Sequence, residues 1–167
     1  MTKIKLPTKY LPSLKEIKDS AKQLKMLMKS RKQYKKGKFF TRKKIKSYKS
    51  KPSNHITDAR KIYGIQNITP NKELSRKTGC SLSALKQIVR KGQGAYYSSG
   101  SRPNQTSQSW GLARLASSIT AGKSAAVDYD ILEKGCDHKK KAFLLAQKSR
   151  RKYKFGHSKT RKTAVNV

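Results

Sequence analysis

The sequence predicts a mainly α-helical protein: a small bundle of short, capped helices around an ordered loop rich in Gly, Ser and Tyr, with extended basic N- and C-terminal arms. Apolar residues recur at intervals of three and four, as they do on one face of a helix. Ser, Thr or Asp precedes several of these stretches and Gly follows them, which is typical of helix caps. Lysine dominates both ends of the chain.

The charge of the chain defines its expected organisation. The 167 residues include 42 Lys and Arg but only 8 Asp and Glu, which gives a formal charge of +34. Residues 1–52 carry +17 and residues 147–167 carry +8, so we expect a basic N-terminal arm, a helical core over residues 53–146 and a basic C-terminal tail. Repulsion of this size opposes compaction unless a polyanion or an acidic protein surface neutralises it.

Cysteine content and hydropathy suggest a cellular setting. Cys80 and Cys136 are too few for a disulfide framework, and no apolar signal segment opens the chain, which favours two buried thiols in a reducing intracellular setting. No run approaches the roughly 18 apolar residues of a membrane-spanning helix. We therefore expect a protein that is soluble or peripheral to a membrane.

The N-terminal arm is expected to hold one amphipathic helix. Residues 1–12 contain two prolines, which suits an extended segment. Ser13 to Glu16 has the spacing of a capping box, and the helix that it starts runs to about Lys36, where Gly37 stops it. One face of this helix is a stripe of lysines, which is either a solvated surface or a contact for a polyanion.

Aromatic residues alternate with cations on both sides of the core. Residues 38–52 place Phe39, Phe40 and Tyr48 among lysines, and the C-terminal tail repeats this alternation around Tyr153. Such a segment binds nucleic acid by phosphate pairing and base stacking, or lies across a protein surface with its aromatic residues as anchors. The sequence leaves both alternatives open.

Three short helices are predicted before the loop. Each begins at a capping residue and ends at a glycine: Ser53 to Gly64, Thr69 to Gly79, and Ser81 to Gly92.

The second and third helices, over residues 73–91, resemble a helix-turn-helix. Gly79 falls at the turn, although Ser75 replaces the usual small apolar residue. In this interpretation four side chains face the major groove of DNA: Ser81, Ser83, Lys86 and Gln87. The alternative is an ordinary packing of two short helices.

The ordered loop is predicted over residues 92–105, with Tyr96 and Tyr97 as its aromatic bulk and Trp110 after it. Its glycines permit positive φ angles, and its polar side chains bond to their own backbone. The same side chains could instead bind an anion, and the candidates are Ser98, Ser99, Ser101 and Arg102.

Three more helices are predicted after the loop. The first has Thr106 or Ser107 as its cap and ends at Gly122, the second runs from about Ser124 to Gly135, and Asp137 caps the third. The third would bury residues 142–145. We expect the acids of residues 128–137 to pair with arginines of the core or with a neighbour's basic arm.

No catalytic, cofactor or metal site is predicted. The Gly-Lys-Ser of residues 122–124 lacks both the earlier glycine and the strand of a phosphate-binding loop. Cys136 and His138 are near each other, but no paired spacing completes the four ligands of a zinc site. An enzyme is therefore not expected.

Two blocks carry a resemblance to a known family. Residues 94–106, GAYYSSGSRPNQT, and residues 109–117, SWGLARLAS, resemble an uncharacterised family of small basic proteins of large nucleocytoplasmic DNA viruses, with a related block in some tailed phages. The resemblance covers roughly residues 59–135. It implies a viral protein that is made in the host cytoplasm or nucleus and carried in the particle, and it implies no reaction.

We therefore expect a non-enzymatic virion structural protein of a large double-stranded DNA virus, such as a minor capsid or cement protein that bridges capsid subunits through basic arms. Its partners would be other capsid proteins, and possible further contacts are nucleic acid or an acidic membrane surface. The alternative is a DNA-binding protein that organises the viral genome. The candidate contacts for a partner or polyanion are Lys32, Lys35, Lys36, Arg42, Lys43, Lys44, Arg150, Arg151, Lys152 and Arg161.

Overall fold

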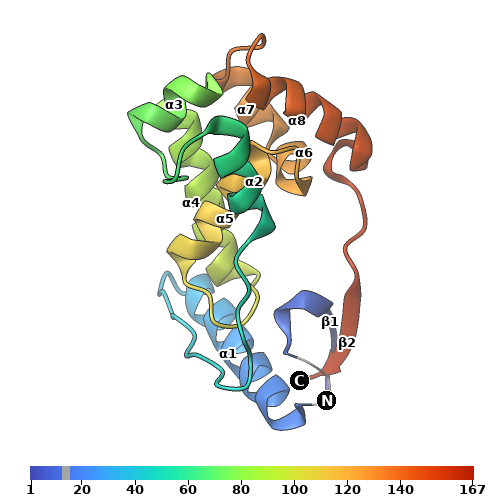
Figure 1. Cartoon of the computed structure of the whole chain (residues 1–167). Coiled ribbons are helices and arrows are strands. Elements are labelled where there is room, and N and C mark those ends of the chain that lie inside the picture. The colour runs from blue at the N-terminus through green and yellow to red at the C-terminus, as the bar shows by residue number, and fades with distance from the viewer. Residues whose placement is uncertain (13–15) are drawn as a thin grey trace. The chain divides into compact units, whose positions relative to one another are not determined.

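The computed structural model describes residues 1–12 and 16–167 (Figure 1). Within them the chain is mainly helical, with eight α-helices and one two-stranded sheet, so the predicted fold class is confirmed at this level. The chain forms two compact units, which we describe separately. The terminal unit comprises residues 1–51, 94–107 and 159–167, and the helical unit comprises residues 52–93 and 108–158.

The two ends of the chain pair with each other in the terminal unit. Strand β1 (Lys3–Pro7) runs antiparallel to β2 (Lys162–Asn166), and the register places Lys3 opposite Asn166. The backbone N–H of Thr2 also donates to the carbonyl of Val167, at 3.1 Å, so the termini lie side by side (Figure 1). Part of each basic end therefore belongs to a sheet.

The terminal unit is completed by helix α1 (Ile17–Lys35) and a short 3₁₀ turn (Thr8–Tyr10). The predicted capping box falls partly on residues 13–15, which lie outside the described residues, and Glu16 makes no side-chain cap hydrogen bond. The predicted stop is confirmed, since Gly37 has a φ of +70°. Close packing fixes Gly100, because a Cβ there would lie 2.8 Å from Cδ2 of Leu27.

The helical unit is built from seven short helices that pack around one apolar core. They are α2 (Asn54–Tyr63), α3 (Lys72–Thr78), most of α4 (Leu82–Ser98), α5 (Ser107–Ser118), α6 (Lys123–Val127), α7 (Tyr129–Gly135) and α8 (Lys141–Lys152). A 3₁₀ turn (Lys154–Gly156) follows α8. The core includes Leu74, Leu85, Ile88, Leu115 and Leu132, all fully buried.

Three of the six caps predicted in the first half of this unit are confirmed, and Ser53 precedes α2 without a side-chain cap hydrogen bond. Gly64 and Gly79 end α2 and α3 in the left-handed conformation that favours glycine. Ser81 caps α4, since its Oγ accepts from the N–H of Ala84 at 3.1 Å. The predicted start of α3 at Thr69 is wrong: Asn71 is the cap, and its Oδ1 accepts from the N–H of Leu74 at 2.8 Å.

The prediction that Gly92 ends the third helix and opens the loop is also wrong. Helix α4 continues through Gly92 and Gly94 to Ser98, so only the second half of the predicted loop is non-helical. A Cβ at Gly92 would lie 2.6 Å from Cα of Gly111 on α5. This glycine therefore serves a close approach of two helices rather than a turn.

Four predictions for the second half need correction. The helix expected over residues 124–135 is divided at Asp128 into α6 and α7. Gly122 precedes α6 and does not end α5. Asp137 does not cap α8, because its carboxylate accepts from the N–H of Lys139, at 2.9 Å, in the turn before the helix. Leu144 points outward with 52% of its surface exposed, although Phe143 is buried as expected.

Cys80 and Cys136 form a disulfide, which corrects the expectation of two buried thiols. The bond joins the turn before α4 to the residue after α7, where the two cysteines already face each other in an isolated antiparallel bridge. A spacing of 56 residues gave no sign of this proximity. The described residues contain no helix that is long and apolar enough to cross a membrane.

Candidate polyanion interface

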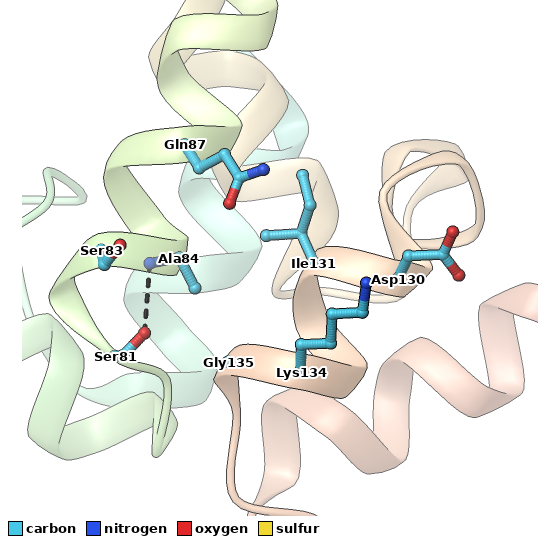
Figure 2. A pocket seen from close by; sticks show the side chains of 8 residues that line it. All are labelled: Ser81, Ser83, Ala84, Gln87, Asp130, Ile131, Lys134 and Gly135. Carbon is cyan, nitrogen blue, oxygen red and sulfur yellow. Dashed lines mark hydrogen bonds between the residues drawn. The ribbon is translucent and has the colours of Figure 1, made fainter.

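The predicted helix-turn-helix residues lie beside an open groove in the helical unit. Ser83, Lys86 and Gln87 are exposed on the first turns of α4, as the interpretation requires. The groove has a volume of about 340 Å³ and separates these turns from α7. Figure 2 shows Gln87 and Ile131 facing each other across it, with Asp130 at its outer side and turned away from α4.

Helix α7 is fixed against the start of α4. The N–H of Ser81 donates to the carbonyl of Gly135 at 2.7 Å, and a Cβ on Gly135 would lie 2.4 Å from Cβ of Ala84. Ser81 itself is used as the helix cap (Figure 2). One side of the supposed recognition helix is therefore covered. The carboxylate of Asp130 would also repel phosphate near the groove, so the groove is poorly suited to DNA.

Arg42 is buried, so it cannot serve as the surface contact that the sequence suggested. Its Nη1 donates to Ser30 Oγ at 2.9 Å and to the carbonyl of Tyr96 at 2.8 Å, and its Nη2 donates to Ser101 Oγ at 2.8 Å. The guanidinium also lies 3.8 Å from the ring centre of Tyr96. Desolvation by burial lowers the pKa of Arg42, against smaller opposing effects of the nearby tyrosines.

Two of the four loop residues proposed to bind an anion make hydrogen bonds within the terminal unit. Ser101 is fully buried, donates to the carbonyl of Arg102 at 2.7 Å and accepts from Arg42, so it is not available to a ligand. The carbonyl of Ser99 accepts from Nε and Nη2 of Arg31, at 2.9 and 2.6 Å. These bonds within the unit support the alternative in which the loop is ordered by its own contacts.

The other predicted partner contacts lie mostly on the surface. Apart from Arg42, this set contains six lysines and three arginines, and one of these arginines is half-buried. The exposed ones are Lys32, Lys35, Lys36, Lys43, Lys44, Arg151, Lys152 and Arg161, and Arg150 is half-buried. Internal acids cannot neutralise such a surface, because the chain would keep +34 even if each of its 8 acids paired with one cation.

One acid forms ion pairs inside the helical unit. Asp128 is buried and accepts two hydrogen bonds from Arg114, Nε to Oδ2 at 2.8 Å and Nη2 to Oδ1 at 2.7 Å. Nζ of Lys91 lies 3.1 Å from the same Oδ1. The expectation that the acids of this segment pair with core arginines is confirmed for Asp128, whereas Asp130, Glu133 and Asp137 are exposed.

Two exposed phenylalanines stand among these cations, one in each unit. Phe39 has 71% of its surface exposed and Phe155 has 60%. The guanidinium of Arg150 lies 4.3 Å from the ring centre of Tyr129 and 4.9 Å from that of Phe155. Phe155 has a φ of +57°, which is unusual for an aromatic residue. The sequence indicated this mixture of aromatic and basic residues, but it did not show which rings are exposed.

These features define a mainly helical, strongly cationic protein with exposed basic and aromatic side chains. No group of three or more His, Cys, Asp or Glu residues is placed to hold a metal ion within residues 1–12 and 16–167. The chain belongs to the family of unknown function DUF5824, whose model matches residues 7–141. No curated protein and no solved structure matches the chain.

Proposed function

We propose that the chain is a non-enzymatic structural protein of a virus particle, and that its exposed basic residues bind a polyanionic or acidic partner. The observation that carries this proposal is the uncompensated surface charge. The most buried acid, Asp128, is already paired with Lys91 and Arg114 inside the helical unit, so the charges that remain must be neutralised from outside the chain.

The first form of the proposal is a minor capsid or cement protein of a large double-stranded DNA virus. The resemblance of residues 94–117 to proteins of large nucleocytoplasmic DNA viruses supports this setting. The basic residues at both ends would then lie against major and minor capsid proteins, or against acidic lipid headgroups beneath the shell. A cement protein needs many modest contacts rather than one deep site, and the exposed basic residues at both ends would supply such contacts.

The second form is a nucleic-acid-binding protein that organises the viral genome. The exposure of Phe39 and Phe155 beside basic residues favours it, because aromatic rings add base stacking to phosphate pairing. On an acidic protein surface the same rings would serve as apolar anchors.

Fractionation of purified particles tests both forms. A cement protein remains with shells that have been emptied of DNA, at fixed positions related by the capsid symmetry. A genome-organising protein leaves with the nucleoprotein and is released by nuclease or by high salt. Absence of the chain from both fractions would contradict the structural role itself.

A further inference from the structure

We propose that Tyr34, Phe39 and Tyr97 form a base-stacking site for single-stranded nucleic acid. We call these three residues the Phe39 cluster, and all three belong to the terminal unit. The inference deepens the second form of the proposed function and rests on it, since it assigns the type of nucleic acid and the side chain that contacts the base.

The three rings contact one another and leave Phe39 open to solvent. The ring centre of Phe39 lies 5.0 Å from that of Tyr97 and 6.2 Å from that of Tyr34, and the two tyrosine rings are nearly parallel, at 7°. Phe39 is 71% exposed and Tyr34 is 37% exposed. Tyr97 is partly buried, and its hydroxyl lies 3.2 Å from Ser107 Oγ. The tyrosines therefore support a ring with an accessible surface.

The end of α1 fixes the backbone that carries this ring. The N–H of Gly37 donates to the carbonyl of Tyr34, and the N–H of Lys38 donates to the carbonyl of Gln33, both at 2.9 Å. With Gly37 at a φ of +70°, these two bonds form the Schellman ending of a helix. Phe39 follows directly, so its position is set before any ligand binds, which lowers the entropic cost of stacking.

The surroundings of the cluster favour an anionic ligand. Lys35, Lys36 and Lys38 are exposed next to it. The acids of the terminal unit are Glu16 and Asp19, which lie at least 15 residues earlier on or before α1, about 22 Å away along a helix axis. Phosphates would pair with the lysines while a base stacks on Phe39.

Among nucleic acids, a single strand suits an exposed ring better than a duplex does. In a duplex the bases are already stacked on each other, so their faces are not available to a protein ring unless the duplex opens. In a single strand the faces are free, and stacking on an aromatic side chain works for every base. The cluster therefore predicts a preference for single strands without a sequence requirement.

Fluorescence anisotropy of the full chain with a labelled oligothymidylate, and with a duplex of equal phosphate number, tests this proposal. We expect Phe39→Ala and Phe39→Leu to bind the single strand about 5- to 100-fold more weakly and to bind the duplex as the wild type does. Leu144→Ala, which removes an exposed aliphatic side chain of the helical unit, is the matched control and should change neither affinity. Circular dichroism verifies that each variant is folded.

The outcomes of this experiment test the Phe39 cluster and the nucleic-acid-binding function separately. If the wild type binds the single strand and both Phe39 variants bind equally well, the Phe39 cluster is not the site, although the second form of the function stands. An equal loss for both polymers would also overturn the stacking role. If the wild type binds neither polymer at low salt, the site and the nucleic-acid form fail together. A loss of self-association in the Phe39 variants, with unchanged binding, would assign the cluster to a protein contact instead.

Discussion

The guanidinium of Arg42 lies over the ring of Tyr96, 3.8 Å from its centre, while the backbone N–H of Arg42 donates to the hydroxyl of the same tyrosine at 3.0 Å. Both residues are buried in the terminal unit. Ser30, Ser101 and the carbonyl of Tyr96 complete the hydrogen bonds of the guanidinium. Arg42, which the sequence suggested as a surface contact, thus joins α1, the segment after it and the end of α4.

This network predicts that Arg42→Lys destabilises the chain. A lysine has no planar fork with which to reach Ser30 and Ser101 together, and it stacks poorly on Tyr96. We expect the free energy of unfolding to fall by about 2–4 kcal/mol, as measured by urea denaturation. The matched control is Lys43→Ala at the exposed neighbouring position, which should change stability by less than about 0.5 kcal/mol. Equal effects of the two changes would contradict the buried role of Arg42.

Asp128→Asn should destabilise the helical unit, because it removes the negative charge that pairs with Arg114 and Lys91. Arg114 is partly exposed and Lys91 is more exposed, so water compensates some of the loss. We expect a cost of about 2–3 kcal/mol at neutral pH. Asp130→Asn, on an exposed carboxylate two residues away, is the control. A melting temperature of Asp128→Asn that matches this control would show that the ion pairs contribute nothing.

The crossing of α4 and α5 gives a prediction about two glycines. A Cβ on Gly111 would lie 2.7 Å from the carbonyl oxygen of Val89, so Gly111→Ala should cost about 1–3 kcal/mol in spite of the better helix propensity of alanine. Gly94→Ala, on the same helix α4, meets nothing closer than 3.7 Å and should stabilise the chain by up to about 1 kcal/mol. Thermal melts of the two variants should therefore shift in opposite directions. Shifts of the same sign would contradict the close approach at Gly111.

Tyr63 predicts a loss of stability at alkaline pH. Its hydroxyl donates to the carbonyl of Ile119 at 2.6 Å, and burial raises its pKa above that of an unfolded tyrosine. The unfolded phenol ionises near pH 10. The contribution of Tyr63 is therefore complete below about pH 10 and is lost as the pH rises toward the higher pKa of the folded state.

Comparison of the wild type with Tyr63→Phe isolates this effect from the titration of the lysines. At neutral pH the variant should lose about 1 kcal/mol with the hydrogen bond. Above about pH 10 the unfolding free energy of the wild type should fall more steeply than that of the variant. Parallel profiles would show that Tyr63 ionises as readily in the folded chain as in the unfolded one.

The disulfide predicts a redox-dependent stability. The bond spans 56 residues, and closing a loop of this length stabilises a fold by about 4 kcal/mol in the chain-entropy model. The double variant Cys80→Ser, Cys136→Ser should unfold at a correspondingly lower urea concentration, with or without reductant. Titration of the denatured, unreduced wild type should find no free thiol. Two free thiols before reduction would mean that the cysteines are not bonded.

The sequence predicted elements that depend on local chemistry better than it predicted packing. The left-handed glycines Gly64 and Gly79 and the cap at Ser81 were correct because their signals lie within a few residues of the helix ends. Gly92 was wrong because a glycine that permits a turn and a glycine that permits a close helix contact look alike in sequence. Only the position of Gly111, 19 residues later, distinguishes the two.

The same difference between local signals and long-range packing applies to the candidate site. The sequence located basic segments and their aromatic residues, and most of the named cations are exposed. It could not show that Arg42 and Ser101 bond to each other inside the terminal unit, because their separation of 59 residues carries no periodic signal. For the same reason, the approach of Tyr34 and Phe39 to Tyr97 appears only in the folded chain.

The salt dependence of polyanion binding tests the central claim most directly. The full chain is titrated into a nucleic-acid duplex over a series of salt concentrations, beside a variant with charge reversals at Lys43, Lys44, Arg151 and Lys152, all exposed in the wild type. The account predicts that the logarithm of the affinity falls linearly with the logarithm of the salt concentration, and that the variant has a shallower slope. No binding at low salt, or an affinity that salt and the reversals leave unchanged, would contradict it.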